Sequence, residues 1–339
     1  MEKYVISMYD KGQNEAGPKA KVDAEDFLAT AGFKKLNFYF SGARKAKLMS
    51  YKQSFWDIPR QIKKLEAQTV VFQYPSFDQR TDQVIVKNVR RFTQAKLLYL
   101  IHDIESLRAY AGDVAYRKKE IAFLNQSDGL IVHNEKMKAW LKENGVIKPM
   151  TVLEIFDYAN PVKLTTDRPY EKSICYAGNL QKADFLQKLE LSSPLALYGP
   201  NKATTYPKNL TYYGSFPPDE LPAKLTQNFG LVWDGTSIER CDGSFGNYLK
   251  YNDPHKTSLY LSSGLPVIIW KEAALADFIV KNQVGLTVEN LAQLDEILSE
   301  LTPEMYHQMC QNVAKVAHKM RLGAYLQAAV TKLEYEVTK

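Results

Sequence analysis

The sequence predicts an α/β protein made of two units, each a parallel sheet covered by helices. Short apolar runs typical of strands alternate with amphipathic helical patterns along the chain of 339 residues, and this order gives doubly wound sheets. The runs Val70–Phe72 and Leu97–Ile101 are apolar at every position, as strands buried between two helix layers must be. The pattern weakens at residues 157–170, where Pro161 and Pro169 stand among Thr and Asp residues. We interpret that segment as a linker.

Each unit is expected to repeat the strand–helix order. In the first unit the apolar runs predict strands at 4–8, 36–40, 69–73, 97–101 and 129–132, with helices at 20–31, 55–66, 84–93, 116–125 and 136–143. In the second unit they predict strands at 173–177, 196–198, 210–212, 229–233, 266–269 and 285–288, with helices at 256–262, 273–282, 292–301 and 304–318. A last amphipathic helix is expected at 322–337. Ligands bind such folds at the carboxyl ends of the strands, so a cleft between two sheets is the expected site.

Composition narrows the class of protein. Apolar residues make up 45% and charged residues 24% of the chain, which is typical of globular proteins. Three scattered cysteines give neither a disulfide framework nor a four-ligand zinc site. The first residues lack the basic and apolar regions of a signal peptide, and no apolar run approaches the roughly 20 residues of a membrane span. We therefore expect a cytoplasmic protein without a transmembrane segment.

The charge is uneven along the chain. Residues 1–150 carry 26 Lys and Arg against 17 Asp and Glu, whereas residues 151–339 carry 18 against 21. A basic first half either attracts a phosphate, an acidic polymer or a membrane surface, or consists of ordinary solvated helix faces. No nucleic-acid-binding signature is present, so we expect no nucleic-acid partner.

Two glycine-containing turns follow predicted strands. The loop 9–21 contains Gly12 and Gly17 and runs into a helix, but it is neither a G-x-G-x-x-G fingerprint nor a P-loop. This argues against a dinucleotide oxidoreductase and a nucleoside-triphosphate hydrolase. In the second unit the strand 173–177 ends in Gly178 and Asn179, with Lys182 shortly after. Such a turn suits a phosphate or ribose, although a plain turn explains it equally well.

The most informative segment is Gly243–Trp270. A glycine-containing loop with Asn252 enters a helix near Pro254, and the first turn of that helix collects a histidine, a lysine and two hydroxyls, at His255, Lys256, Thr257 and Ser258. Free backbone amides, hydroxyls and a lysine at a helix start can hold a diphosphate without a metal ion. An ordinary helix cap explains the proline but not the crowding of polar residues.

These residues carry a family resemblance. The segment Gly264-Leu265-Pro266-Val267-Ile268 resembles the G-x-P-V-I segment of GT-B glycosyltransferases. The chain as a whole is similar to the glucosyltransferase 3-like family, which includes the glucosyltransferase of serine-rich-repeat adhesin glycosylation and bacterial galactofuranosyltransferase-like proteins. Further marks are Ala16–Ala20, Val71–Pro75, Ile101–Asp103, Tyr176–Asn179, Phe229–Trp233 and Asn252–Ser258.

The resemblance implies two Rossmann-like domains facing each other across a cleft, with the last helix crossing back to the first domain. It implies a metal-independent transferase that binds a UDP-sugar mainly through its second domain, binds the acceptor on the first, and forms a homo-oligomer, often a tetramer. The donor-binding residues expected here are Gly17, Gly178, Asn179, Lys182, Asn252, His255, Lys256, Thr257 and Ser258. Some members have arginine where this chain has Lys182, and lysine cannot bind a phosphate bidentately.

An inverting transferase needs a general base for the acceptor hydroxyl. Asp103 and His102, just after a predicted strand, are the candidates, with Asp78 as a second choice; His102 could instead only bond backbone. Gln73, Tyr74 and Asp78 are expected to bind the acceptor. His133, His307 and His318 lack partners at metal-ligand spacing, so no metal site is expected.

The predicted reaction is transfer of a hexose, with glucose preferred, from a UDP-sugar to a sugar-bearing acceptor such as a GlcNAc-modified serine-rich-repeat adhesin. Two alternatives stay open: a galactofuranosyltransferase of cell-surface polysaccharide synthesis, and a non-catalytic sugar-binding or stabilising subunit. The donor sugar, the linkage and the acceptor depend on single pocket contacts that no spacing rule reaches. Contact with a membrane surface stays open as well.

Overall fold

The chain forms two compact units in a computed structural model that describes residues 2–10, 16–40, 52–76 and 79–339. The first unit combines Met1–Leu153 with Tyr325–Lys339, and the second is Glu154–Ala324. The segment 157–170, expected to be a linker, thus lies within the second unit. Within the described residues, no helix has the length and apolar character needed to cross a bilayer.

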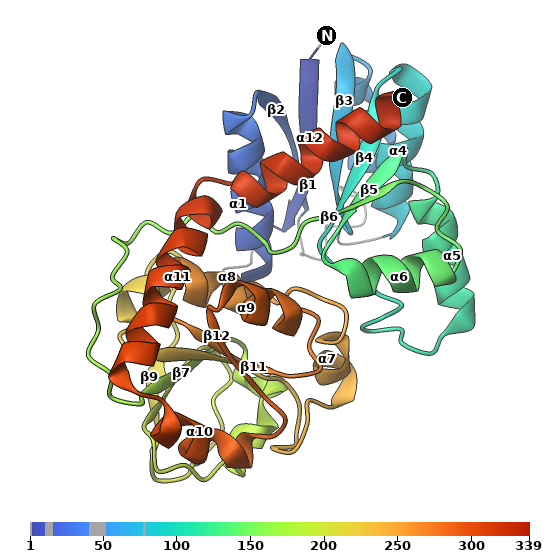
Figure 1. Cartoon of the computed structure of the whole chain (residues 1–339). Helices are drawn as coiled ribbons and strands as arrows, with labels where there is room; N and C mark the ends of the chain where they lie inside the picture. Colours follow the sequence, from blue (N-terminus) through green and yellow to red (C-terminus); the bar gives the residue numbers. More distant parts are fainter. Residues whose placement is uncertain (1, 11–15, 41–51, 77–78) are drawn as a thin grey trace. The chain divides into compact units, whose positions relative to one another are not determined.

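The first unit is built on a parallel sheet of six strands in the order β2-β1-β3-β4-β5-β6 (Figure 1). The strands are β1 (Glu2–Asp10), β2 (Phe33–Phe40), β3 (Ala67–Tyr74), β4 (Lys96–Ile101), β5 (Gly129–Val132) and β6 (Met150–Val152). Val70, Val71 and Phe72 are fully buried, which confirms that the all-apolar run of β3 is covered on both faces. All predicted strands of this unit are present, and β6 is an addition of three residues.

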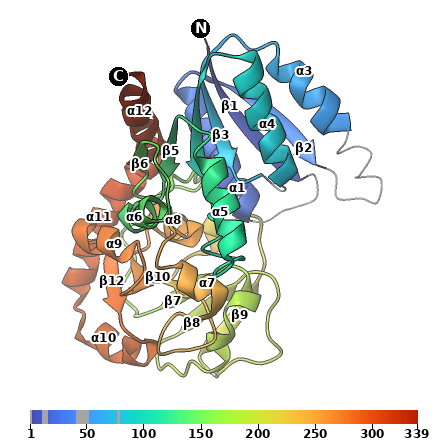
Figure 2. The same ribbon diagram turned by 90° about the vertical axis from the view of Figure 1, so that its right-hand side faces the viewer.

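Helices cover both faces of this sheet. They are α1 (Ala16–Thr30), α3 (Ile58–Ile62) with the π-helical turn η1 (Gln53–Asp57) before it, α4 (Gln79–Phe92), α5 (Val114–Leu124), α6 (Glu135–Glu143) and α12 (Ala324–Thr338). Figure 2 shows α12 on one side of the sheet and α3 and α4 on the other. The last helix is tied to the first strand by an ion pair of 2.7 Å between Lys3 and Glu334. This confirms that the carboxyl-terminal helix returns to the first unit.

The second unit has its own parallel sheet of six strands, in the order β12-β11-β10-β7-β8-β9. The strands are β7 (Ile174–Ala177), β8 (Leu195–Tyr198), β9 (Leu210–Gly214), β10 (Phe229–Val232), β11 (Val267–Trp270) and β12 (Gly285–Val288). Since β7 and β10 are neighbours, the segments that follow these two strands emerge at the same edge of the sheet.

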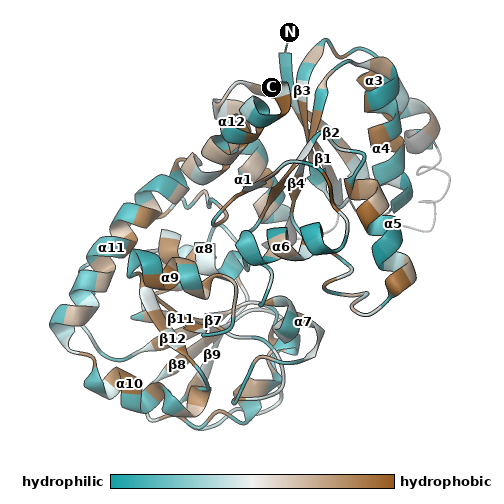
Figure 3. Ribbon diagram, turned by 45° about the vertical axis from the view of Figure 1, so that its right-hand side comes forward, coloured by the Kyte–Doolittle hydropathy of each residue, from teal (hydrophilic) through white to brown (hydrophobic). Residues whose placement is uncertain are grey.

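The helices of the second unit are mostly short. They are α7 (Gly243–Tyr248), α8 (His255–Ser262), α9 (Ala276–Asn282), α10 (Leu294–Glu300) and α11 (Pro303–Arg321). Between them lie the 3₁₀ turns η2 (Leu180–Lys182), η3 (Asp184–Gln187), η4 (Leu221–Lys224) and η5 (Leu291–Gln293). In Figure 3 the strands are largely hydrophobic and the long helices α11 and α12 carry hydrophilic stretches. Amphipathic helices over apolar strands therefore form the core, as the sequence predicts.

The middle of β10 depends on a glycine. A Cβ atom built on Gly230 would lie 2.1 Å from the ring of Tyr260, which is fully buried in α8. Bare backbone at Gly230 therefore lets α8 pack directly on β10.

We predict that Gly230→Ala lowers the free energy of unfolding by about 3 kcal/mol, because the added methyl overpacks a rigid aromatic contact. Gly129→Ala is the matched control, since its methyl would meet the flexible end of Leu333 at 2.8 Å and should cost less. Urea denaturation of both variants checks this, and equal losses would contradict it.

Candidate functional site

Polar groups gather around one lysine, Lys256, at the carboxyl edge of the second sheet. The Lys256 Nζ atom lies 2.6 Å from Asp234 Oδ1, and it also donates to the Tyr176 hydroxyl at 3.1 Å and the Trp233 carbonyl at 3.3 Å. The Tyr176 hydroxyl in turn donates to Asp234 Oδ1 at 2.9 Å. Burial and the neighbouring Asp234 charge raise the pKa of Tyr176 well above its usual value, so this hydroxyl keeps its proton.

Three neighbouring elements build this cluster. Tyr176 lies in β7, Asp234 follows β10, and Lys256 comes from the first turn of α8. The Lys256 and Asp234 side chains are only 14% and 11% exposed. With three acceptors, all N–H donors of this partly buried ammonium are engaged, so its position at the edge of the sheet is fixed.

Helix α8 is anchored along its length. The Tyr260 hydroxyl accepts a hydrogen bond of 2.7 Å from the Ala177 amide, which fixes the helix beside the end of β7. At the carboxyl end, Arg321 donates to the Ser262 carbonyl at 2.9 Å, and Arg168 donates to the Ser263 carbonyl at 3.1 Å. Cations at a helix carboxyl terminus stabilise the helix, and the opposite end is the one that favours anions. These contacts hold the second half of α8, and the bond from the Ser258 hydroxyl to the Phe156 carbonyl, at 2.7 Å, holds the half that carries Lys256.

The other residues predicted to bind the donor near the start of α8 differ in their contacts. The Ser258 hydroxyl is buried and donates to the Phe156 carbonyl at 2.7 Å. The His255 ring packs 5.2 Å from the ring of Tyr158. Thr257 Oγ1 and Asn252 Oδ1 are buried and lack a hydrogen-bond partner within the described parts of the chain.

The turn after β7 comes close to Lys256. A Cβ atom on Gly178 would lie 3.9 Å from the Lys256 side chain, and one on Gly199 would collide with the Gly178 carbonyl at 1.8 Å. Both glycines have positive φ, so the two turns can cross closely. Asn179 caps η2 by accepting from the Gln181 amide at 3.1 Å.

The structure brings Gly178 and Lys256 together, whereas Lys182 has a different neighbour. The Lys182 Nζ atom lies 4.0 Å from the centre of the Phe245 ring, a cation–π contact at the start of α7. Sequence reasoning missed Asp234 and Tyr176 as members of the site. An aspartate directly after a buried strand was the available signal, but its pairing with Lys256 depends on the neighbouring positions of β7 and β10.

A second polar cluster lies at the carboxyl edge of the first sheet. The Gln73 amide nitrogen donates to the Ser7 hydroxyl at 2.7 Å and the Lys21 carbonyl at 3.0 Å. Gln73 Oε1 lies 2.7 Å from His102 Nε2. Gln73 is fully buried, whereas His102 is half-buried. The imidazole is therefore the end of this hydrogen-bonded series that is open to solvent.

Tyr74 and Asp103 are held by protein groups. Tyr74 is buried and donates to Glu120 at 2.8 Å. Glu120 also accepts from the Glu105 amide at 3.0 Å and the Ser106 amide at 2.8 Å, and so fixes the loop after β4. In that loop Asp103 pairs with Arg108 at 3.2 Å.

Gln73 and Tyr74, predicted to bind an acceptor, thus have the contacts of residues that position others. Glu120 was not predicted. Asp78 lies outside the described residues. Gly17 lies in the first turn of α1, at the end nearest the glycine loop.

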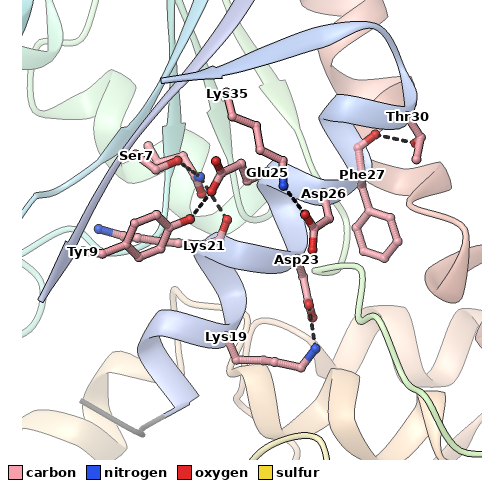
Figure 4. Close-up of polar contacts among 11 residues, drawn as sticks. Ser7, Tyr9, Lys19, Lys21, Asp23, Glu25, Asp26, Phe27, Thr30 and Lys35 are labelled. Atoms are coloured by element: carbon pink, nitrogen blue, oxygen red, sulfur yellow. Dashed lines mark hydrogen bonds and ion pairs between the residues drawn. The ribbon is translucent and has the colours of Figure 1, made fainter. Parts of the chain in front are cut away.

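Helix α1 carries a buried charge network at this edge (Figure 4). Lys19 pairs with Asp23 at 2.6 Å, and the figure shows Tyr9 and Glu25 pointing toward each other, where the hydroxyl donates to the carboxylate. The Lys21 ammonium donates to the Pro75 carbonyl at 2.6 Å. Burial lowers the pKa of Lys21 to about 8, against the opposing effect of Asp82 and Asp103.

Because the pKa of Lys21 is about 8 in the folded chain and 10.5 ordinarily, the unfolded chain binds more protons between these values. The Lys21 contribution to the free energy of unfolding must therefore rise with pH across that window. We predict that wild type gains about 2 kcal/mol relative to Lys21→Met between pH 7 and 9.5. Urea denaturation at both pH values checks this, and parallel pH dependences would contradict it.

His133 is buried, its Nε2 donates to the Ile101 carbonyl at 3.1 Å, and burial lowers its pKa to about 4, so the ring is neutral. In the described ranges, no group of three or more His, Cys, Asp or Glu residues could hold a metal ion.

Comparison with known proteins gives matches along the chain. The models described as glucosyltransferase 3-like, N-terminal domain, and glucosyltransferase 3-like, C-terminal domain, match residues 2–155 and 174–333. The β-1,6-galactofuranosyltransferase WbbI of Escherichia coli (strain K12) is 36% identical over 248 residues, which are 72% of each chain. Glucosyltransferase 3 of Streptococcus gordonii is 25% identical over 346 residues, or 99% of each chain.

Solved structures of the same architecture are more distant in sequence. An alpha-glucosyltransferase (AGT) in complex with UDP has a TM-score of 0.59 at 10% identity and is covered, like this chain, over its full length. WaaG, a glycosyltransferase of lipopolysaccharide biosynthesis, has a TM-score of 0.57 at 13% identity, with 98% of this chain and 99% of that chain covered. Together with the two parallel sheets, these likenesses confirm the predicted two-domain GT-B fold.

Proposed function

The chain belongs to the glucosyltransferase 3-like family and is a glycosyltransferase, and we propose that it moves a hexose from a UDP-sugar to a sugar-bearing acceptor without a metal ion. The observation that carries the proposal is the Lys256 ammonium at the carboxyl edge of the second sheet, 2.6 Å from Asp234. The diphosphate is the leaving group of such a donor, and its developing negative charge needs a fixed cation.

The first turn of α8 offers two kinds of positive charge to a diphosphate. Lys256 supplies a full charge, and the amides of the helix start supply partial charges directed the same way. Gly178 beside Lys256 leaves backbone accessible where a side chain would stand. These groups support metal-independent binding of UDP, with Asn179, Lys182, Asn252, His255, Thr257 and Ser258 proposed around them.

Asp234 sets the state of the site before the donor arrives. It pairs with the Lys256 ammonium and holds this side chain in one rotamer, so little side-chain entropy is lost on binding. A diphosphate takes over part of this role, and Lys256 then shares its hydrogen bonds between Asp234 and the phosphate. The first unit activates the acceptor, through His102 or Asp103 as general base.

Glucose is the first proposed donor, because Glucosyltransferase 3 of Streptococcus gordonii aligns over 99% of this chain; its proposed acceptor is a GlcNAc-modified serine-rich-repeat adhesin. The second candidate is a galactofuranosyltransferase of polysaccharide synthesis, favoured by the 36% identity to WbbI. A homotetramer in the cytoplasm and contact with a membrane surface remain proposals. If UDP does not bind, a non-catalytic sugar-binding or stabilising subunit becomes the favoured function.

We predict that Lys256→Met weakens UDP binding by about 10- to 100-fold, because a charge-assisted hydrogen bond to phosphate contributes about 1.5–3 kcal/mol. Isothermal titration calorimetry in EDTA measures it. Lys271→Met is the matched control, since Lys271 also pairs with a carboxylate at 2.6 Å but is 61% exposed. Unchanged UDP affinity in Lys256→Met would contradict the proposal. If that variant fails to fold, Lys256→Met combined with Asp234→Asn removes both charges of the buried pair.

A second prediction concerns Asp234. Asn keeps the Oδ1 acceptor for Tyr176 but leaves Lys256 without its counter-charge, so Asp234→Asn should lose about 3 kcal/mol of folding free energy. The same change should tighten UDP binding by at least about 3-fold, because the phosphate no longer competes with a carboxylate. Thermal unfolding with and without UDP measures both effects. Weaker UDP binding at unchanged stability would show that Asp234 acts on the ligand directly.

A further inference from the structure

The hydrogen bonds around Gln73 fix which end of its amide faces His102. One side of the amide lies 3.0 Å from the Lys21 carbonyl, and a carbonyl oxygen can only accept a hydrogen bond. The amide nitrogen must therefore be on that side, where it also donates to the Ser7 hydroxyl. Oxygen Oε1 is left facing His102 Nε2 at 2.7 Å.

The orientation of this amide determines the tautomer of His102. Oε1 is only an acceptor, so the imidazole Nε2 must carry a proton to make the bond of 2.7 Å. In the neutral ring the other nitrogen, Nδ1, then holds the lone pair. Gln73 has no freedom to reverse this, because it is fully buried and its nitrogen is bonded at two places.

We propose that Gln73 is a positioning residue that holds His102 in the Nε2–H tautomer, so that Nδ1 is the atom that accepts the acceptor hydroxyl proton during glycosyl transfer. This inference rests on the proposed function. In the step, the acceptor oxygen forms a bond to the anomeric carbon and its proton moves to Nδ1. The bond from the anomeric carbon to the diphosphate oxygen breaks, and UDP leaves with that electron pair. His102 becomes an imidazolium that still donates through Nε2 to Gln73.

Other charged groups pack around this edge of the sheet, from several elements. Among the described residues they include Lys19, Lys21, Asp23 and Glu25 of α1, Asp82 of α4, Asp103 and Arg108 of the loop after β4, Glu120 of α5, and His133 after β5. Burial sets the pKa of His133 at about 4 and that of Lys21 at about 8, on either side of the range in which an ordinary imidazole titrates.

The tautomer can be measured without any assay of activity. In the ¹⁵N-histidine-labelled full chain, long-range ¹H–¹⁵N spectra distinguish protonated from unprotonated ring nitrogens, and His102→Gln identifies the signals of His102. We expect Nε2 protonated and Nδ1 unprotonated at pH 8. Ser7→Ala should keep this tautomer, because the Lys21 carbonyl alone still fixes the amide, whereas Gln73→Met should mix the two tautomers. A protonated Nδ1 in wild type would overturn the inference.

The role in catalysis is read from the pH dependence of kcat. Gln73→Glu places a carboxylate beside Nε2 and stabilises the imidazolium, so the acidic limb should move up by about 1–2 pH units. Gln73→Met should lower kcat by about 2-fold or more, because a part of the His102 population then carries its proton on Nδ1 and cannot act as the base. An acidic limb that does not move in Gln73→Glu, or one that is lost in Asp103→Asn and kept in His102→Gln, would overturn the role of His102.

The two proposals fail in different ways. The expected spectrum combined with no turnover of any UDP-sugar and no UDP binding would overturn the proposed function, and with it the base, while the tautomer stands. Turnover that depends on Lys256 combined with a protonated Nδ1 would overturn only this inference.

Discussion

The ion pair between Lys256 and Asp234 connects the elements that build the candidate site of the second unit. It joins the first turn of α8 to the segment after β10, and Tyr176 of β7 completes it. Each partner compensates the charge of the other in a place where an uncompensated charge would be costly. The rest of α8 serves this arrangement, since Tyr260 docks the helix on the sheet and two arginines hold its far end.

In the first unit, hydrogen bonds between neutral groups hold the candidate residues in place. Its buried chain from Ser7 through Gln73 to His102 has a direction that is imposed by one backbone carbonyl, that of Lys21. The loop carrying Asp103 is fixed separately by the buried Glu120 carboxylate. In each unit the candidate residues thus lie at the carboxyl edge of its own parallel sheet, which is where α/β folds generally bind ligands.

Most of the fold could be predicted because its signals are local. Continuous apolar runs such as Leu97–Ile101 mark buried parallel strands whatever their order in the sheet. Two elements, β6 and α7, were not predicted, and the reasons are again local. Strand β6 has only three residues, too few for a pattern, and α7 contains two glycines, which disfavour a helix.

The candidate site could be predicted only in part, because its pairings are not local. Lys256 was recognised from the crowded helix start, but Asp234 lies 22 positions away and becomes its partner only through the order of the strands. Gln73 was predicted to bind the acceptor, from a segment that resembles the family. Its real neighbours, Ser7 and the Lys21 carbonyl, come from segments more than 50 positions distant.

The most direct test of the central claim is UDP release by the purified full chain, measured with a panel of UDP-sugars in EDTA and with a GlcNAc-bearing acceptor peptide or a polysaccharide-precursor glycan. The account predicts acceptor-dependent turnover of one UDP-hexose that is unaffected by EDTA and is lost in Lys256→Met. Absence of both turnover and UDP binding, or turnover that survives the loss of Lys256, would contradict it.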